Sequence, residues 1–290
     1  MDPLDFYAMR SGAVTQPDGS PATLRVVPLG VLELPSGQLE ASDPFVMLGQ
    51  GPVLDIGPGS YEAFVTIADV SEQQDGSHER EAYLSIVLRD GVVSEVGTIA
   101  LDEDSDDPDS YWAVPVDAGT VAFADHEAVG ACMPAETGQG ASWYESVFET
   151  GSEDSWFALM DSPEHYEAGI ANIVMPLATR GENVVLSHSG WGDGCYPVVV
   201  TLDSEGNILG VHIDLLVVGP VYADDEDDEQ SDDGADALAD TAAPGDTGES
   251  SGSAEDAEGG VAYASPLGEE IEDVPGKETG FLGNLFGRGK

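Results

Sequence analysis

The hydrophobic positions of residues 1–220 fall into short runs that glycine and proline turns interrupt. Residues 61–70 place Tyr61, Val65 and Ile67 on one side of an extended chain, and this period of two is typical of a strand. Further strands are predicted in the runs 26–34, 84–88, 92–101, 183–186, 196–202 and 208–218. The pattern predicts a mainly β fold of the α+β class, an antiparallel sheet or sandwich with a few short helices.

Two of these groups of strands suggest a pairing. Residues 84–88 and 92–101 are separated by Arg89-Asp90-Gly91, and an Asp-Gly step favours a tight hairpin turn. The runs 183–186, 196–202 and 208–218 follow one another closely, and we expect them to form a meander.

Helical signals are few and short. Residues 125–131 are expected to form a helix with Asp125 as its N-cap, because an Asp side chain accepts hydrogen bonds from first-turn amides. Residues 142–149 and 154–160 are two further helical candidates. We expect their aromatic side chains to lie on buried faces: Trp143, Phe148, Trp156 and Phe157.

Charge changes along the chain and divides it into three parts. The 290 residues include 57 Asp or Glu and 8 Lys or Arg, a net charge of −49. Residues 1–220 carry the apolar runs and form the predicted folded domain. Residues 221–276 contain no Lys or Arg and few large apolar side chains, which predicts a disordered acidic linker. Residues 277–290 are again apolar, and basic.

This last segment has the chemistry of a recognition peptide. Phe281, Leu282, Leu285 and Phe286 would share one face of a helix, and Arg288 follows them. An apolar, basic peptide on an acidic tether suits docking into a partner's groove or folding back on the body. A frayed terminus without a role is the alternative, and membrane contact is a weaker one because a single amphipathic turn binds poorly.

The acidic charge disfavours several classes of function. Binding a phosphate backbone needs clustered Lys or Arg, so a nucleic-acid ligand is not expected, and anionic membranes are repelled. No apolar run reaches the ~20 residues that span a bilayer, and the N-terminus is too polar for a signal peptide. A cytoplasmic bacterial protein with reduced thiols is expected. Two accounts of the charge stay open, an acidic or halophilic proteome and mimicry of nucleic acid.

The most specific motif is the glycine-rich loop at residues 189–194, Ser189-Gly190-Trp191-Gly192-Asp193-Gly194, followed by Tyr196. Its three glycines allow positive φ and close backbone approach. One interpretation is a structural turn, in which Asp193 caps loop amides and Trp191 plugs the core. The other places Trp191 and Asp193 at the rim of a binding pocket. The glycine spacing matches neither a dinucleotide fingerprint nor a phosphate-binding loop.

The chain resembles an uncharacterised bacterial domain family, known only as a domain of unknown function. The resemblance rests on the block Ser-Gly-Trp-Gly-Asp-Gly-Cys-Tyr-Pro-Val at residues 189–198, on Pro-Ser-Gly-Gln-Leu-Glu-Ala-Ser-Asp-Pro at residues 35–44, and on shorter matches between them. It implies a shared fold with recurring Asp and Gly positions, but no activity. In that family the position of Cys195 more often holds an apolar or aromatic residue, which argues against a cysteine nucleophile.

Carboxylates beside turns and strand ends are the candidates for a chemical site: Asp43, Asp117, Asp125, Asp193 and Asp214. Asp214 lies inside an apolar run, where a carboxylate must be hydrogen-bonded, paired or metal-bound. No cofactor is predicted, although convergence of these side chains would create an oxygen-ligand site for Ca²⁺ or Mg²⁺. The simpler interpretation is that each one caps a turn.

A nucleophilic site could be assembled from Cys195, His188 or His212, and Asp214, but such sets arise easily in a chain with 57 acidic residues. A buried, hydrogen-bonded histidine is the simpler expectation for His212. The leading hypothesis is therefore a non-enzymatic acidic binding protein with a tethered docking peptide, for example an immunity- or inhibitor-type protein that covers a basic partner. The alternative is a metal-assisted hydrolase that uses the Asp cluster around residues 189–194.

Overall fold

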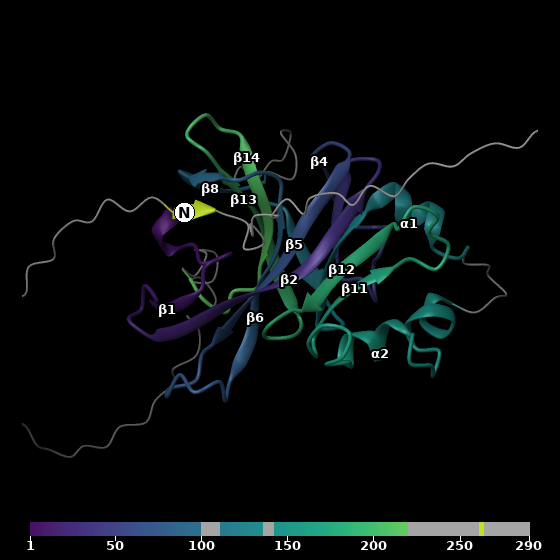
Figure 1. Cartoon of the computed structure of the whole chain (residues 1–290), viewed down its shortest axis with the longest axis horizontal. Helices are drawn as coiled ribbons and strands as arrows, with labels where there is room; N and C mark the ends of the chain where they lie inside the picture. The colour runs from purple at the N-terminus through teal and green to yellow at the C-terminus, as the bar shows by residue number, and fades with distance from the viewer. Residues whose placement is uncertain (100–110, 136–141, 220–260, 264–290) are drawn as a thin grey trace, which may run out of the picture.

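The computed structural model describes residues 1–99, 111–135, 142–219 and 261–263, and it is built mainly from antiparallel strands (Figure 1). The predicted mainly β class is confirmed. The described helices are short: the 3-10 turn η1 (Pro3–Asp5), α1 (His126–Cys132), the π-helical turn η2 (Tyr144–Phe148) and α2 (Trp156–Asp161).

The larger sheet has eight strands, in the order β1-β2-β5-β6-β14-β13-β8, with β9 also paired to β13. Its strands are β1 (Gly12–Thr15), β2 (Pro21–Leu34), β5 (Gly59–Asp69), β6 (Glu79–Val87), β8 (Glu95–Thr98), β9 (Ala113–Val116), β13 (Gly194–Leu202) and β14 (Ile208–Asp214).

The smaller sheet has five strands, in the order β11-β12-β10-β3-β4. They are β3 (Gln38–Ser42), β4 (Val53–Asp55), β10 (Thr120–Asp125), β11 (Ile170–Val174) and β12 (Asn183–His188). A separate pair joins β7 (Gly91–Val93) to β15 (Val261–Tyr263).

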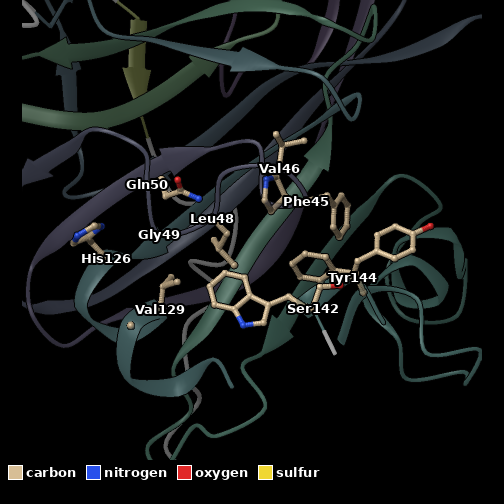
Figure 2. A pocket seen from close by; sticks show the side chains of 13 residues that line it. Phe45, Val46, Leu48, Gly49, Gln50, His126, Val129, Ser142 and Tyr144 are labelled. Atoms are coloured by element: carbon tan, nitrogen blue, oxygen red, sulfur yellow. The ribbon is translucent and has the colours of Figure 1, made fainter. Parts of the chain in front are cut away.

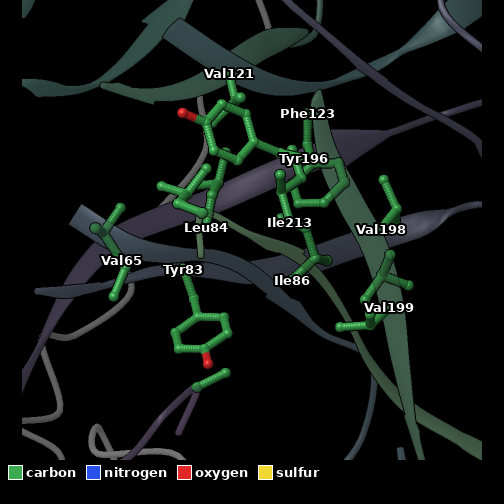
Figure 3. Close-up of a cluster of buried hydrophobic side chains, with 14 of the residues drawn as sticks. Val65, Tyr83, Leu84, Ile86, Val121, Phe123, Tyr196, Val198, Val199 and Ile213 are labelled. Carbon is green, nitrogen blue, oxygen red and sulfur yellow. The ribbon is translucent and has the colours of Figure 1, made fainter. Parts of the chain in front are cut away.

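The five-stranded sheet is the middle of three layers. Val121 and Phe123 of β10 belong to the core shared with the eight-stranded sheet, whereas Ala122 and Ala124 belong to a second core beneath the helices, with Trp156. This division follows from the two-residue period of a strand. Figure 3 shows Leu84 and Ile86 of β6 with Val121 and Phe123 in the inter-sheet core.

The opposite face of the eight-stranded sheet is covered by the N-terminal segment. Phe6 packs edge-on against Tyr83 and against His212, with ring centroids 5.1 Å apart in both pairs. The Tyr83 hydroxyl donates to the carbonyl of Val218, 2.9 Å away. Both ends of the described body, residues 1–219, therefore meet on this face of the sheet.

Two predicted pairings are wrong. The expected hairpin over residues 82–101 does not form, because β6 pairs with β5 and β14, whereas β7 pairs with β15 and β8 with β13. The expected late meander holds only for β13 and β14. β12 lies in the other sheet, between β10 and β11.

The short helices agree with the sequence. Asp125 caps α1, and its side chain accepts from the amide of Ala128. Ser155 caps α2, and η2 lies within the predicted segment 142–149. Phe148 and Trp156 are buried, while Trp143 and Phe157 are partly buried beside them.

Most of the predicted linker, residues 221–276, lies outside the described residues, as does the whole C-terminal segment 277–290. The exception is Val261–Tyr263, which forms β15 on the edge of β7. The linker composition did not anticipate this strand. In the part of the chain that is described, no helix is long and apolar enough to cross a bilayer.

His212 is a fully buried histidine held by hydroxyl groups. Its Nδ1 lies 2.9 Å from Ser85 Oγ and its Nε2 lies 3.1 Å from Thr201 Oγ1. Burial lowers the pKa of His212 to about 3, whereas the pKa of a histidine in an unfolded chain is about 6.5. Between these values the unfolded chain binds a proton that the folded state excludes, so stability falls as pH drops through this window.

We therefore expect His212→Gln to flatten the acid side of the stability profile. Between pH 7.5 and pH 5, wild type should lose about 2 kcal/mol of unfolding free energy relative to this variant. Urea unfolding followed by tryptophan fluorescence measures the difference. His78→Gln, at an exposed position, is the control and should keep the wild-type profile. Parallel profiles for wild type and His212→Gln would contradict the assignment.

Candidate functional site

The loop of residues 189–194 is the corner where the chain passes from the smaller sheet to the larger one, between β12 and β13. Ser189 is buried and its hydroxyl donates to the carbonyl of Gly192, 2.6 Å away. The Tyr196 hydroxyl donates to the same carbonyl at 2.8 Å, and the Ser189 amide donates to Gly119 at 3.0 Å. These three hydrogen bonds fix the conformation of the corner.

Gly190 is the position where this corner tolerates no side chain. Its φ is +69°, and a Cβ there would lie 2.6 Å from Val217 Cγ2 and 2.7 Å from the carbonyl oxygen of Glu81. Gly192 has φ +98°, but a Cβ there would meet no atom within 4 Å. Close backbone approach is required at the first glycine, and backbone conformation alone at the second.

Trp191 does not plug the core, so that part of the structural interpretation is wrong. Its side chain is 52% exposed, and its indole N–H donates to the carbonyl of Leu216 at 3.3 Å. The guanidinium of Arg80 lies 5.3 Å from the ring centroid, a cation–π distance, and the His78 ring meets the indole edge-on. Sequence reasoning missed both basic partners because they lie on and beside β6, more than 100 residues earlier.

Asp193 and Asp117 are exposed, so neither lies in a closed site. None of the described hydrogen bonds has the Asp193 side chain as acceptor, so the predicted cap on the loop amides is not seen among them. Gly194 begins β13 opposite Val116. The rim position that the sequence predicted for Trp191 and Asp193 is consistent with their exposure, but these two residues border no cavity described here.

Asp43 is a fully buried carboxylate that ties two turns together. One oxygen accepts from the amides of Asp117 and Ala118, at 2.9 and 2.7 Å, and the other from Thr120 Oγ1 at 2.9 Å and the Phe45 amide at 3.2 Å. Four donors satisfy the charge that burial would otherwise penalise. Asp43 thus joins the end of β3 to the turn before β10.

Asp125 and Asp214 are also occupied with the backbone. Asp125 accepts from the amide and hydroxyl of Ser36 and from the amide of Ala128. Asp214 is buried and accepts from the amide of Leu216 at 3.0 Å. These contacts give Asp43, Asp125 and Asp214 structural roles, and among the described residues no three His, Cys, Asp or Glu side chains form a metal-binding group.

The residues proposed for nucleophilic chemistry lie in different environments. Cys195 is exposed at the start of β13 and Cys132 is buried, and both are free thiols. His212 is buried among hydroxyl groups on the face covered by Phe6. His188 is exposed at the end of β12.

One ionisable pair was missed by the sequence. The carboxyl of Glu81 on β6 is 14% exposed and lies 4.0 Å from His188 Nδ1. Burial raises the pKa of Glu81, while His188, Arg80 and Arg25 act in the opposite direction. A Cβ at Gly169 would lie 2.6 Å from Glu81 and 2.8 Å from His188, so this glycine lets the pair approach. Only the fold brings these three positions together.

A cavity of about 420 Å³ lies on the helical side of the smaller sheet, between α1, η2 and the turn after β3. We call this cavity the groove. Figure 2 shows Phe45 and Tyr144 toward one end and Gln50 and His126 toward the other. Its lining residues are Pro44, Phe45, Val46, Leu48, Gly49, Gln50, His126, Val129, Gly130, Ser142, Trp143, Tyr144 and Phe148.

The polar end of the groove is fixed by a buried carboxylate. Glu40 is fully buried, lies 2.7 Å from His126 Nδ1, and accepts from the amide of Gly49 at 2.7 Å. At the aromatic end, Phe45 packs against Phe148, with ring centroids 5.1 Å apart. None of the groove residues is Lys or Arg.

The family model described as "Protein of unknown function (DUF4241)" matches residues 32–213. The chain belongs to this family. The expectation of a domain of unknown function is thereby confirmed. No curated protein and no solved structure matches the chain. The DUF4241 span includes the corner at residues 189–194 and the whole groove, but not residues 277–290.

Gly190 and Gly192 give a matched pair of variants. Gly192→Ala should cost about 1–3 kcal/mol of unfolding free energy, from positive φ alone. Gly190→Ala should cost about 1–3 kcal/mol more, because its Cβ also overlaps Val217 and the Glu81 carbonyl. Chemical denaturation of both variants tests this, and equal losses would show that the close approach at Gly190 is not what constrains the corner.

Asp43 and Asp193 should likewise differ in how much each stabilises the fold. Asp43→Asn should destabilise the fold by about 2–4 kcal/mol, since one amide oxygen cannot accept from both sets of donors. Asp193→Asn should stay within about 0.5 kcal/mol of wild type. Melting with and without Ca²⁺ or Mg²⁺ completes the test. A cation-dependent rise in Tm that Asp193→Asn abolishes would instead support a metal site at the loop.

Proposed function

We propose that this member of DUF4241 is an acidic binding protein that recognises a basic partner protein. The observation that carries the proposal is the acidic helical segment, residues 142–164, which covers the smaller sheet. It contains no Lys or Arg and exposes six carboxylates: Glu145, Glu149, Glu153, Asp154, Asp161 and Glu164.

These carboxylates are available to a partner. Glu149 accepts from the hydroxyl of Tyr144, and Asp154 from the hydroxyl of Ser152, but none of the six forms an ion pair within the described residues. A surface of one sign attracts an oppositely charged protein over distance and raises its association rate. The groove adjoins this segment and supplies the apolar area that charge alone lacks.

A specific version of the proposal is an immunity- or inhibitor-type protein that covers a basic site on a toxin or nuclease. The dense negative charge of this surface suits a partner whose basic site has evolved to bind a polyanion. The hydrolase alternative has less support, because Asp43, Asp125 and Asp214 each serve a turn or a cap.

The test compares two charge-neutralised variants of the full chain. A pull-down from native lysate supplies the partner, and its association rate is then measured. Neutralising Glu145, Glu149, Glu153 and Asp154 to Gln or Asn should slow association about tenfold at low salt. The matched control neutralises exposed carboxylates elsewhere: Glu72, Asp90, Glu95 and Glu205. A partner that is not basic, association insensitive to salt, or equal effects of both variants would contradict the proposal.

A further inference from the structure

We propose that the groove is the docking site of the chain's own C-terminal segment, residues 277–290. The inference concerns what covers the groove in the absence of a partner, and it goes beyond the proposed function. It rests on four observations: the exposed apolar side chains of the groove, the sequence of the segment, the charges on both, and the length of the connecting chain.

The groove leaves apolar surface open to solvent. Val46 and Tyr144 at its rim are each 52% exposed, while Leu48 and Phe148 at its base are 3% exposed. Such a concave surface with an aromatic rim and a buried apolar base suits a few inserted apolar side chains, and about 420 Å³ is the size of a small ligand site.

The segment supplies side chains of that kind. Phe281 and Phe286 are the two phenylalanines that follow the described body, and with Leu282 and Leu285 they would share one face of a helical turn. An amphipathic turn that lays its apolar face into a groove is a common mode of peptide recognition. The four glycines of residues 280–289 make this turn unstable alone, so it needs a surface to order it.

Charge favours the same pairing. The segment carries Lys277, Arg288 and Lys290, three of the eight basic residues of the chain. Three glutamates are exposed on or next to the helical elements that line the groove: Glu127 in α1, Glu145 in η2 and Glu149 directly after η2. The most basic stretch of the chain therefore matches the acidic side chains on the two helical elements that line the groove.

The connecting chain is long enough. β15 holds residues 261–263 on β7, and residues 264–280 then lead to Phe281. These 17 residues span at most about 60 Å, whereas a body of 219 residues has a radius of gyration of about 17 Å. The extended chain is more than three times as long as this radius, so the segment can lie against faces of the body well away from β15, and such a tether gives an effective concentration of about 1 mM.

Proximity cross-linking in the full chain tests this. In a Cys195→Ser background, one cysteine is introduced by Gly283→Cys and the other by Val46→Cys at the groove rim. The matched control replaces Val46→Cys with Glu205→Cys, at an exposed turn between β13 and β14. The native Cys132 is buried, and burial raises the pKa of its thiol, so it should not react.

We expect the intramolecular cross-link to form at least about tenfold faster with Val46→Cys than with Glu205→Cys, because docking raises the local concentration. Adding Phe281→Ser and Phe286→Ser should remove this preference, whereas Leu267→Ser and Ile271→Ser, which delete linker side chains instead, should leave it. Circular dichroism confirms that each variant folds.

Two outcomes would overturn the inference. Equal rates at the two positions would mean that the segment does not dock in the groove. Cross-links between molecules, with a yield that grows with protein concentration, would mean that a second copy is the occupant. Neither outcome bears on the acidic helical segment, so the proposed function would stand or fall separately on its own charge variants.

Discussion

Burial of the five-stranded sheet on both faces is the constraint on which the rest of the structure depends. All six residues of β10 are buried, with Val121 and Phe123 toward the larger sheet and Ala122 and Ala124 toward the helices. A strand in that position cannot expose polar groups to water, so neighbouring turns must be satisfied internally. Asp43, with four donors, meets this requirement at the turn before β10.

The same layering creates the two features that could carry function. Chain segments must cross from one sheet to the other, and the crossing after β12 is the corner at residues 189–194, where Gly190 lies against the β6 backbone. On the outer side, small alanines of β10 let α1 and η2 approach the sheet, and the groove opens between these helices and the turn after β3. The motif that dominates the sequence and the cavity thus lie in different parts of the domain.

Electrostatics separates these two regions further. Trp191 lies beside Arg80 and His78, and Arg25 on β2 pairs with Glu79 and Glu167, so several of the few basic side chains are used at or near the corner. The helical segment at residues 142–164 has no such compensation. Charge left unpaired on the surface is stabilised by water and is free to attract a partner. The proposed binding surface therefore lies on the helical face, whereas the corner connects the two sheets.

The sequence by itself determined what depends on local chemistry: the mainly β class, the short helices with the Asp125 cap, the expectation of a buried, hydrogen-bonded His212, and the acidic charge. Tertiary structure alone decided the strand partners. The Asp-Gly step at residue 90 favours a turn, but it does not determine whether the next strand returns to β6, and β8 pairs with β13 instead. Likewise Glu81 and His188, and the walls of the groove, are distant in sequence, and only the packing of three layers brings them together.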